Sequence, residues 1–304
     1  MRDRLVVGTR ASALALWQTN WVVEKLRRLH PGLVVEIVPI KTEGDRVLDA
    51  PLPQLGGKGI FVGEIENALL RGEIDLAVHS LKDLPTEQPA GLAIAAIPER
   101  EDARDALVSR LGLPLAQLPR GAAIGTSSLR RSAQLLAARP DLRIGNLRGN
   151  LDTRLRKAVT DFDAIAVAVA GLLRLGMAGR IDEVLPVDVC TPAVGQGALA
   201  VETRAGDREA IGLVAPLEDP TTRAAVAAER AFLHRLGGGC HVPVGGYAYA
   251  NGEDLTLLAV VADPSGRLCL RRDLTGPRSD PVSLGERLAD LLLAAGAHAL
   301  LGER

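Results

Sequence analysis

The segment RDRLVVGTRASALALWQTNWVVEKLRRLHPGLVVEIVPI, residues 2–40, decides the fold class of this chain. Leu5–Gly8 is a short apolar run typical of a buried strand, and Ser12 is placed to cap the helix that follows. The Pro31-Gly32 pair ends that helix, after which Leu33–Ile40 alternates in the manner of a second strand. A strand, a helix and a strand in this order predict an α/β layer with a mostly parallel sheet.

The same order continues downstream. Further strands are predicted at Ile74–Ser80, Leu92–Ile97, Ala122–Gly125, Leu142–Gly145 and Ala164–Val169, and further helices at Phe61–Arg71, Ser128–Ala138 and Asp152–Val159. The charged stretch Pro98–Arg104 resembles a linker between two α/β halves. Ala198–Glu202 is predicted as a strand that rejoins the first half.

From Asp219 onward the pattern changes. A helix at Thr221–Leu236, strands at Val242–Ala250, Asp254–Ala262 and Arg267–Leu274, and a final helix at Leu284–Leu301 are predicted. We therefore expect an α/β protein with two α/β domains and a smaller α+β C-terminal domain that contains a three-stranded antiparallel sheet. The expected boundaries are 1–98 with 198–217 for domain 1, 103–193 for domain 2 and 219–304 for domain 3.

Composition restricts the possible partners. The chain has 304 residues, of which 47% are hydrophobic, and its 36 Lys and Arg balance 37 Asp and Glu for a net charge of −1. No global basic field exists to hold nucleic acid or an anionic membrane, and only 2% aromatic residues disfavour a base-stacking surface. An odd number of cysteines, three, argues against a disulfide framework and for a reducing compartment.

Targeting signals are weak. Arg10 interrupts the apolar run that a secretory signal would need, and the uncharged stretches Ala164–Leu173 and Leu291–Gly302 are shorter than the roughly 20 residues that span a bilayer. These features predict a cytoplasmic protein without a membrane partner.

Arginines gather where predicted strands pass into helices. Gly125–Arg131 places Arg130 and Arg131 in the first turn of a helix, where the dipole disfavours positive charge by about 0.3–1 kcal/mol each. A bound anion would explain them, and a serine-capped helix with solvent-facing arginines is the alternative. Gly8–Ser12 and Asn146–Asn150 occupy two equivalent junctions, so a single polyanionic ligand is expected at the carboxyl ends of the strands.

Two further segments carry reactive groups. Asp83 and Lys82 follow the strand Ile74–Ser80, where Asp83 is either a turn residue or an ionised carboxylate that steadies a cation, and His79 fits a hydrogen-bonded core histidine. Cys240 follows three glycines, which favours an accessible nucleophile or attachment point over a packing cysteine.

Common cofactor motifs are missing. The Gly57-Lys58-Gly59 segment lacks the spacing of a phosphate-binding loop, Gly195-Gln196-Gly197 precedes a strand instead of a helix, and the five histidines are scattered. No metal or nucleotide cofactor is expected.

Taken together, these motifs resemble the porphobilinogen deaminase (hydroxymethylbilane synthase) family over nearly the whole chain. The resemblance is carried by Gly8-Thr9-Arg10-x-Ser12-x-Leu14-Ala15-x-x-Gln18, Lys41-Thr42-x-Gly44-Asp45, Gly57-Lys58-Gly59-x-Phe61, Ala77–Pro85, Arg100-Glu101-Asp102-x-Arg104-Asp105, Gly125–Arg131, Leu147–Asn150, Ala170-Gly171-Leu172-x-Arg174-Leu175-Gly176 and Gly237–Pro243.

The resemblance implies a fold and an activity. Two domains similar to periplasmic anion-binding proteins and a third α+β domain are implied, together with a monomeric enzyme. The implied reaction joins four porphobilinogen molecules head to tail into hydroxymethylbilane, with release of ammonia, on a dipyrromethane cofactor held by a thioether to cysteine.

Residue roles are implied in the same way. Cys240 corresponds to the attachment cysteine and Asp83 to the catalytic aspartate. Cofactor and substrate binding fall to Arg10, Ser12, Gln18, Lys58, Phe61, Ser80, Lys82, Thr126, Ser127, Ser128, Arg130, Arg131, Arg148, Arg154, Gly171, Arg174 and Gln196.

Two departures and two competing hypotheses accompany the resemblance. Gly63 stands where many members have lysine, and His241 stands where glutamine is common. A non-catalytic anion-binding protein and a nucleotide-dependent dehydrogenase are the competing functions, and the second lacks its fingerprint here.

Overall fold

The computed structural model describes residues 2–42, 62–237 and 243–301. The chain divides into two compact units, which we call unit 1 (Met1–Glu101 with Ala198–Arg223) and unit 2 (Asp102–Gly197 with Ala224–Arg304). Lys58, Phe61, Cys240 and His241, all named by the sequence analysis, lie outside the described residues.

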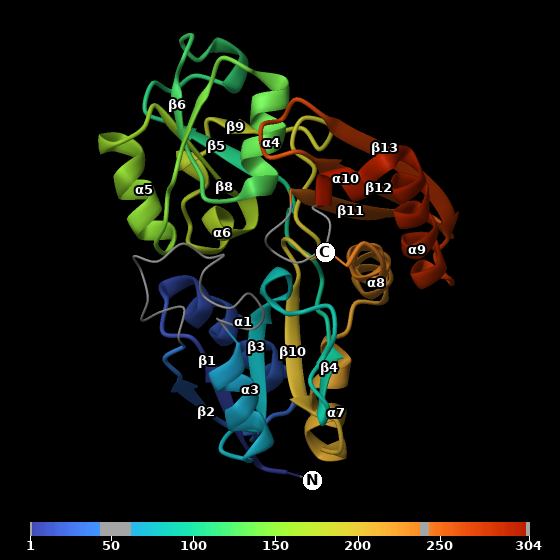
Figure 1. The fold of residues 1–304 in the computed structure, drawn as a ribbon. Helices are drawn as coiled ribbons and strands as arrows, with labels where there is room; N and C mark the ends of the chain where they lie inside the picture. Colours follow the sequence, from blue (N-terminus) through green and yellow to red (C-terminus); the bar gives the residue numbers. More distant parts are fainter. Residues whose placement is uncertain (1, 43–61, 238–242, 302–304) are drawn as a thin grey trace. The chain divides into compact units, whose positions relative to one another are not determined.

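Unit 1 is built on a five-stranded sheet with the order β2-β1-β3-β10-β4 (Figure 1). Its strands are β1 (Arg4–Thr9), β2 (Val34–Pro39), β3 (Leu76–Ser80), β4 (Leu92–Ala96) and β10 (Leu199–Arg204). β1 pairs in parallel with β2 and β3, whereas β10 pairs antiparallel with both β3 and β4. The prediction that Ala198–Glu202 rejoins the first half is confirmed.

Helices cover both faces of this sheet. α1 (Ala13–Leu29) and α7 (Arg208–Val214) contribute Val22, Leu26 and Val214 to the core on one face. α3 (Gly63–Leu70) packs Ile65 and Leu69 against the other face. Ser12 caps α1 as predicted, since its Oγ accepts from the amide of Ala15 at 3.3 Å.

Unit 2 contains a second five-stranded sheet with the order β7-β6-β8-β5-β9. Its strands are β5 (Asp105–Ser109), β6 (Ala123–Gly125), β7 (Arg143–Gly145), β8 (Ala164–Ala168) and β9 (Glu183–Val184). α4 (Leu129–Ala138) covers one face, and α5 (Leu151–Thr160) and α6 (Val169–Arg174) cover the other. β6 is parallel to β7 and β8, and β5 is antiparallel to β8.

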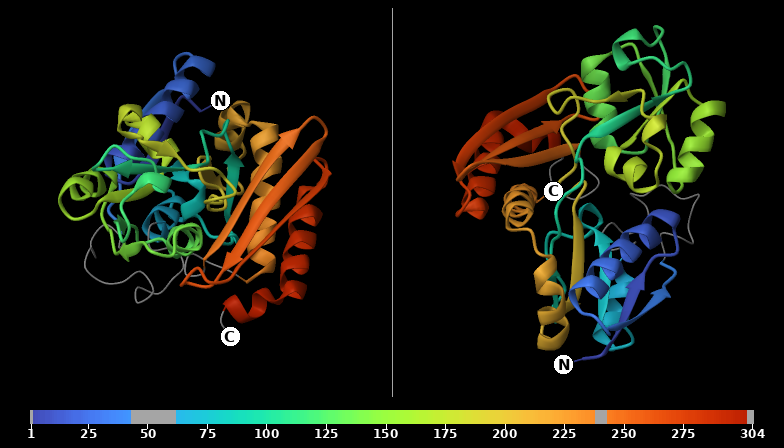
Figure 2. Two further views of the ribbon diagram at one scale, coloured as in Figure 1. Left: turned by 90° about the horizontal axis from the view of Figure 1, so that it is seen from above. Right: turned by 180° about the vertical axis from the view of Figure 1, so that it is seen from behind.

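Unit 2 also holds the antiparallel sheet β11-β12-β13, which is formed by Val244–Asn251, Asp254–Ala262 and Cys269–Pro277. Figure 2 shows α8 (Pro220–Arg235) and α9 (Pro281–Leu292) beside this sheet, and Phe232 and Leu288 from these helices lie in its core. The fold is therefore mixed α/β with a separate three-stranded antiparallel sheet, as predicted. The expected three-domain boundaries stay a prediction.

Three local predictions need correction. β5 was not predicted, because its five residues DALVS are too few to show a periodicity. Val169 begins α6 instead of ending a strand. The final helix is broken: α9 ends at Leu292, Leu293–Ala297 forms a wider turn in which Gly296 has a φ of 97°, and α10 covers His298–Leu301.

Candidate functional site

In unit 1, the predicted site residues follow strands that end at the same edge of the sheet. Arg10 and Ser12 come directly after β1, and Ser80 ends β3. Because β1 and β3 are parallel neighbours, with Gly8 paired to Ala77, these residues share the carboxyl edge of the sheet.

Asp83 lies at the end of a single 3₁₀ turn, Leu81–Asp83, directly after β3. Leu81 and Leu84 are buried on either side of it, and the Leu81 amide donates to the Ala198 carbonyl at 3.0 Å. These anchors leave the Asp83 side chain exposed and Lys82 half-buried beside it. The backbone of this turn therefore holds the Asp83 carboxylate in place, while its side chain stays in contact with solvent.

Gln18 and Ser80 are brought together from α1 and β3. The Gln18 Nε2 donates to the Ser80 Oγ at 2.9 Å, and Gln18 is buried. Gln18 thereby orients the hydroxyl that stands nearest in sequence to the Asp83 turn.

In unit 2, three strand-to-helix junctions share one edge in the same way. Thr126, Ser127 and Ser128 join β6 to α4, Arg148 precedes α5, and Gly171 and Arg174 lie on α6 directly after β8. The parallel pairing of β6 with β7 and β8 places these three junctions at the same edge of the sheet. Arg154, one turn into α5, donates through Nε to the Gly149 carbonyl at 2.8 Å.

Local geometry requires glycine at this edge. Gly149 has a φ of 114°, which side-chain-bearing residues rarely adopt, and a Cβ there would lie 2.7 Å from the Thr153 side chain. A Cβ on Gly145 would lie 2.4 Å from the ring of Phe162. The backbone at the end of β7 and in the β7–α5 loop therefore depends on these two glycines.

Arg130 and Arg131 point into unit 2 and share the carboxylate of Asp105, the first residue of β5. Arg130 Nη1 lies 2.6 Å from Asp105 Oδ2, and Arg131 Nη2 lies 2.7 Å from Asp105 Oδ1. Both arginines are 5% exposed, and Asp105 is fully buried. The alternative of solvent-facing arginines is therefore wrong, and the anion beside them in the structure is a carboxylate of the chain itself.

The electrostatics of this buried group follow from its charges. Burial acts to raise the pKa of Asp105, but the charges and hydrogen bonds of the two guanidinium groups outweigh it and hold this pKa far below its usual range. Cys190, whose Sγ lies 3.3 Å from Asp105 Oδ2, has a pKa raised to about 12 by burial and by that negative charge. Cys190 is thus an inert thiol packed inside unit 2.

The turn Gly195-Gln196-Gly197 is connected to the same group. Gln196 Nε2 donates to the Ala103 carbonyl at 2.6 Å and to Asp105 Oδ1 at 2.9 Å. Arg174 Nη2 donates to the Gly197 carbonyl at 2.6 Å. Four predicted binding residues, Arg130, Arg131, Arg174 and Gln196, are therefore buried, in contact with Asp105 or with the turn beside it.

Asp105 is the residue that sequence reasoning missed. It stands in the motif Arg100–Asp105, but no strand was predicted after it, so nothing indicated that its carboxylate would be buried. A buried carboxylate requires cationic partners, and a correct prediction of β5 would have pointed to them.

Gly63 begins α3, and a Cβ built there meets no atom within 4 Å among the described residues. The departure from lysine at this position is therefore not imposed by crowding in the part of the chain that the structure describes.

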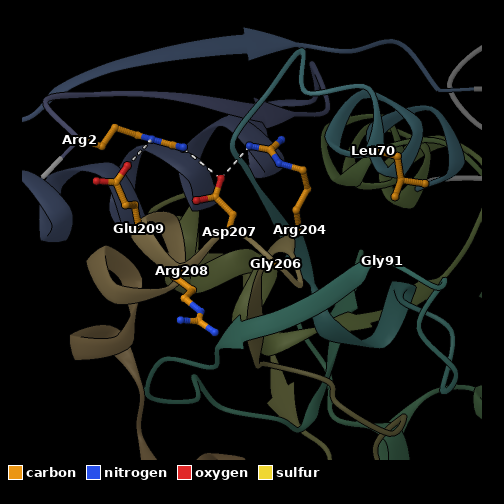
Figure 3. Close-up of a pocket in the computed structure, with 8 residues that line it drawn as sticks. All are labelled: Arg2, Leu70, Gly91, Arg204, Gly206, Asp207, Arg208 and Glu209. Carbon is orange, nitrogen blue, oxygen red and sulfur yellow. Dashed lines mark hydrogen bonds and ion pairs between the residues drawn. The ribbon is translucent and has the colours of Figure 1, made fainter.

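A pocket of about 660 Å3 lies at the opposite edge of the unit 1 sheet, near the start of β1 and the end of β10 (Figure 3). Two of its arginines are paired with Asp207 of the pocket, whose Oδ2 lies 3.2 Å from Arg2 Nη1 and 2.8 Å from Arg204 Nη2. The pocket includes no predicted site residue.

Over residues 2–42, 62–237 and 243–301, no group of three or more His, Cys, Asp or Glu side chains is placed to hold a metal ion. No helix in the described ranges has both the length and the apolar character needed to cross a bilayer.

Comparisons with known proteins cover nearly the whole chain. Residues 5–212 match the family model "Porphobilinogen deaminase, dipyromethane cofactor binding domain", and residues 223–294 match "Porphobilinogen deaminase, C-terminal domain". The porphobilinogen deaminase of Syntrophotalea carbinolica is 55% identical over 98% of this chain and 95% of its own length. That of Roseiflexus castenholzii is 54% identical over 99% of both chains.

Similarity to solved structures is much lower. The VFT2 domain of BvgS from Bordetella pertussis is 16% identical, with a TM-score of 0.40 over 70% of this chain and 85% of that chain. A likeness at this level supports no inference about ligand or mechanism.

Proposed function

This chain belongs to the porphobilinogen deaminase family, and from that membership we propose that Asp83 and Cys240 divide the chemistry between them. The protein is a transferase of tetrapyrrole biosynthesis that polymerises four porphobilinogen molecules head to tail into hydroxymethylbilane, releases ammonia and uses a dipyrromethane cofactor. The competing assignments as a binding protein or a dehydrogenase are not retained.

The residues at the carboxyl edge of the unit 2 sheet fit a dipyrromethane by the chemistry of their donors. Each pyrrole ring carries two carboxylates, and guanidinium groups and hydroxyls are the donors that recognise carboxylates. Arg148 and Arg154 are half-buried at this edge, and the Ser127 hydroxyl donates to the carbonyl of Leu147, the residue before Arg148. We assign the thioether attachment to Cys240, and a dipyrromethane held there would supply the pyrrole carbon to which the incoming substrate is joined.

The proposed role of Asp83 is electrostatic. Loss of ammonia from porphobilinogen leaves positive charge on the pyrrole, and a fixed carboxylate near the ring nitrogen lowers the energy of that cation. After the new carbon–carbon bond forms, the attacking α-carbon loses its proton, and the same carboxylate assists that transfer. The observation that supports this role is the exposed Asp83 side chain on a turn pinned by Leu81 and Leu84.

The remaining proposed binding residues serve the acetate and propionate groups. In unit 1 the proposed binding residues are Arg10, Lys82 and the Gln18–Ser80 pair. Lys58 and Phe61 are proposed on family membership alone. In unit 2 they are Thr126, Gly171, Arg174, Arg130, Arg131 and Gln196, of which the last three bond Asp105 and form the Asp105 cluster with it.

We further propose that the protein works as a monomer in the cytoplasm. The free thiols of Cys190 and Cys269 support a reducing compartment. Sedimentation of the purified holoenzyme tests the monomer, and a dimer at working concentration contradicts it.

The role of Asp83 is tested by Asp83→Ala. The fold and the covalent cofactor should be retained, while the rate of elongation in a single-turnover assay falls by about 10²–10³-fold, the usual cost of removing one electrostatic group. Glu87→Gln, an exposed carboxylate change four residues later, is the matched control. Elongation by Asp83→Ala near the parent rate contradicts the proposal.

The role of Cys240 is tested by intact mass. The parent should carry an adduct of dipyrromethane mass, Cys240→Ser should lose it, and the control Cys269→Ser should keep it. An adduct that survives in Cys240→Ser places the attachment elsewhere.

A further inference from the structure

Three titratable side chains meet inside unit 1, on the face of the sheet that α3 covers. Glu66 comes from α3, His79 from β3 and Glu202 from β10. Glu202 is opposite Ala77 in the ladder, and Ala77 and His79 point to the same face because side chains alternate along a strand. The exposed fractions are 9% for Glu66, 5% for His79 and 0% for Glu202.

The cluster has more acceptors than donors. His79 Nε2 and Glu202 Oε2 lie 3.1 Å apart, but Oε1 of Glu202 and Oε1 of Glu66 have no hydrogen-bond partner among the described residues. Two ionised carboxylates and one imidazole would carry a net charge of −1 or −2 in a buried space. Such a charge is costly, so a proton held by Glu66 both reduces the charge and provides a donor that the cluster lacks.

Among the described residues of α3 and of the strands packed against it, no cation pairs with the cluster. The strands packed against α3 are β1, β3, β4 and β10, and the charged groups on them and on α3, outside the cluster, are Arg4, Arg204 and Glu64. Arg4 is exposed and paired with Glu36, and Arg204 binds Asp75 and Asp207 at the far end of β10. The charges of α1 and α7 belong to helices on the opposite face of the sheet.

Glu66 is the member of the cluster whose pKa changes on folding. Its pKa is raised first by burial and then by the charge of Glu202, while His79 acts in the lowering direction. The folded protein therefore holds a proton on Glu66 at a pH at which the unfolded chain has released it.

The cluster lies directly behind the turn that carries Asp83. The His79–Glu202 contact links β3 to β10. The ladder between these two strands ends one residue after His79, where Ser80 pairs with Leu199. The next contact along the chain is the Leu81 amide on the Ala198 carbonyl, which begins the turn. A change of charge in the cluster therefore acts on the strand pair from which the turn departs.

We propose that Glu66, His79 and Glu202 share protons as one buried cluster and act as positioning residues for Asp83. The expected effect on kcat rests on the proposed role of Asp83. The expected effect on the pH dependence of unfolding does not.

The sign of the pH effect follows from proton linkage. Because the pKa of Glu66 is raised in the folded state, the free energy of unfolding decreases as pH rises from about 4.5, the ordinary value for glutamic acid, through the raised pKa. Glu66→Gln keeps a neutral side chain of the same shape at every pH, so it should remove this decrease.

The test measures thermal unfolding and steady-state kinetics of the holoenzyme from about pH 5 to about pH 9, on either side of the ordinary histidine pKa. We expect Glu66→Gln to flatten both the unfolding midpoint and kcat against pH. Glu202→Gln should lower kcat by about 10–100-fold with KM within about twofold and the cofactor adduct retained. Glu64→Gln, on the same helix but outside the cluster, should keep the parent profiles.

The results of these measurements distinguish three ways in which the proposals can fail. An unfolding midpoint of Glu66→Gln with the parent pH dependence overturns the proton sharing. A flattened midpoint, with the kcat profile unchanged and Glu202→Gln fully active, overturns the positioning role. Full activity of Asp83→Ala instead overturns the proposed function, and the unfolding measurement still decides about the cluster.

Discussion

At the scale of single residues, Arg130 and Arg131 occupy a position that the helix dipole makes unfavourable for positive charge. Asp105 offsets this cost, since its carboxylate bonds both guanidinium groups in a space from which water is excluded. The two arginines, Gln196 and Cys190 then form one polar group in which each member depends on the same carboxylate. The arrangement orients the first turn of α4, which begins at the edge assigned to the cofactor.

Asp105→Asn should destabilise the protein strongly. The change leaves two buried guanidinium groups without their anion, and breaking a buried pair in this way costs about 3–5 kcal/mol. Urea unfolding followed by circular dichroism measures the loss.

Asp290→Asn is the control for this change, because the Asp290–Arg235 pair is half exposed and solvent screens it. Its unfolding midpoint should stay near that of the parent. Equal midpoints for Asp105→Asn and Asp290→Asn would show that Asp105 is not needed to compensate the arginines.

At the scale of elements, the β12–β13 hairpin approaches α4 closely enough to require glycine. Gly266 has a φ of 73°, and a Cβ there would lie 2.4 Å from the Ala133 carbonyl oxygen of α4. Backbone atoms of a helix cannot move aside as a flexible side chain can. The contact joins the antiparallel sheet to the helix that carries Arg130 and Arg131.

Gly266→Ala should therefore cost more than the left-handed conformation alone. Gly252 supplies the comparison, because it has a φ of 63° in the β11–β12 hairpin and no atom within 4 Å of a built Cβ. Gly252→Ala should cost about 1–2 kcal/mol, and Gly266→Ala about 1–3 kcal/mol more. Thermal unfolding of both variants checks the difference, and equal losses would mean that the hairpin does not press on α4.

At the scale of the whole molecule, unit 2 holds two sheets that are connected by polar contacts. Arg271 on β13 donates to Gln134 Oε1 at 3.0 Å, to Thr191 Oγ1 at 2.9 Å and to the Val189 carbonyl at 3.2 Å. The Thr191 carbonyl in turn accepts from Arg130 Nη1 at 2.7 Å. One side chain of the antiparallel sheet is thus linked through Thr191 to the Asp105 cluster.

Arg271→Leu should loosen this connection. Hydrogen bonds from a charged donor contribute about 1.5–3 kcal/mol, so amide exchange should accelerate around residues 189–191 and at the start of α4. Hydrogen–deuterium exchange with mass spectrometry measures it. Arg272→Leu, an exposed neighbour whose Nη1 bonds the Arg271 carbonyl, should leave those amides protected, and equal exchange in the two variants would argue against the link.

Much of the fold could be predicted from local features. Periodicity located β1, α1 and β12, and Ser12 and Ser128 cap their helices as expected, because these signals depend on residues close in sequence. Elements such as β5 and α6 were missed or misassigned, since five or six residues between loops carry too little periodicity.

The candidate site could likewise be predicted only in part. The chain alone determined the residue types, their order, the family they resemble and the edge of each α/β sheet at which they gather, since all of these are encoded in contiguous motifs and in strand direction. Tertiary structure alone decided that Arg130 and Arg131 turn inward to Asp105, that Gln196 joins them, and that Glu66, His79 and Glu202 meet behind the Asp83 turn. These partners are separated by 13 positions (Glu66 and His79) to 136 positions (Glu66 and Glu202) in the chain, and only the burial of charge in a packed interior selects which of them must meet.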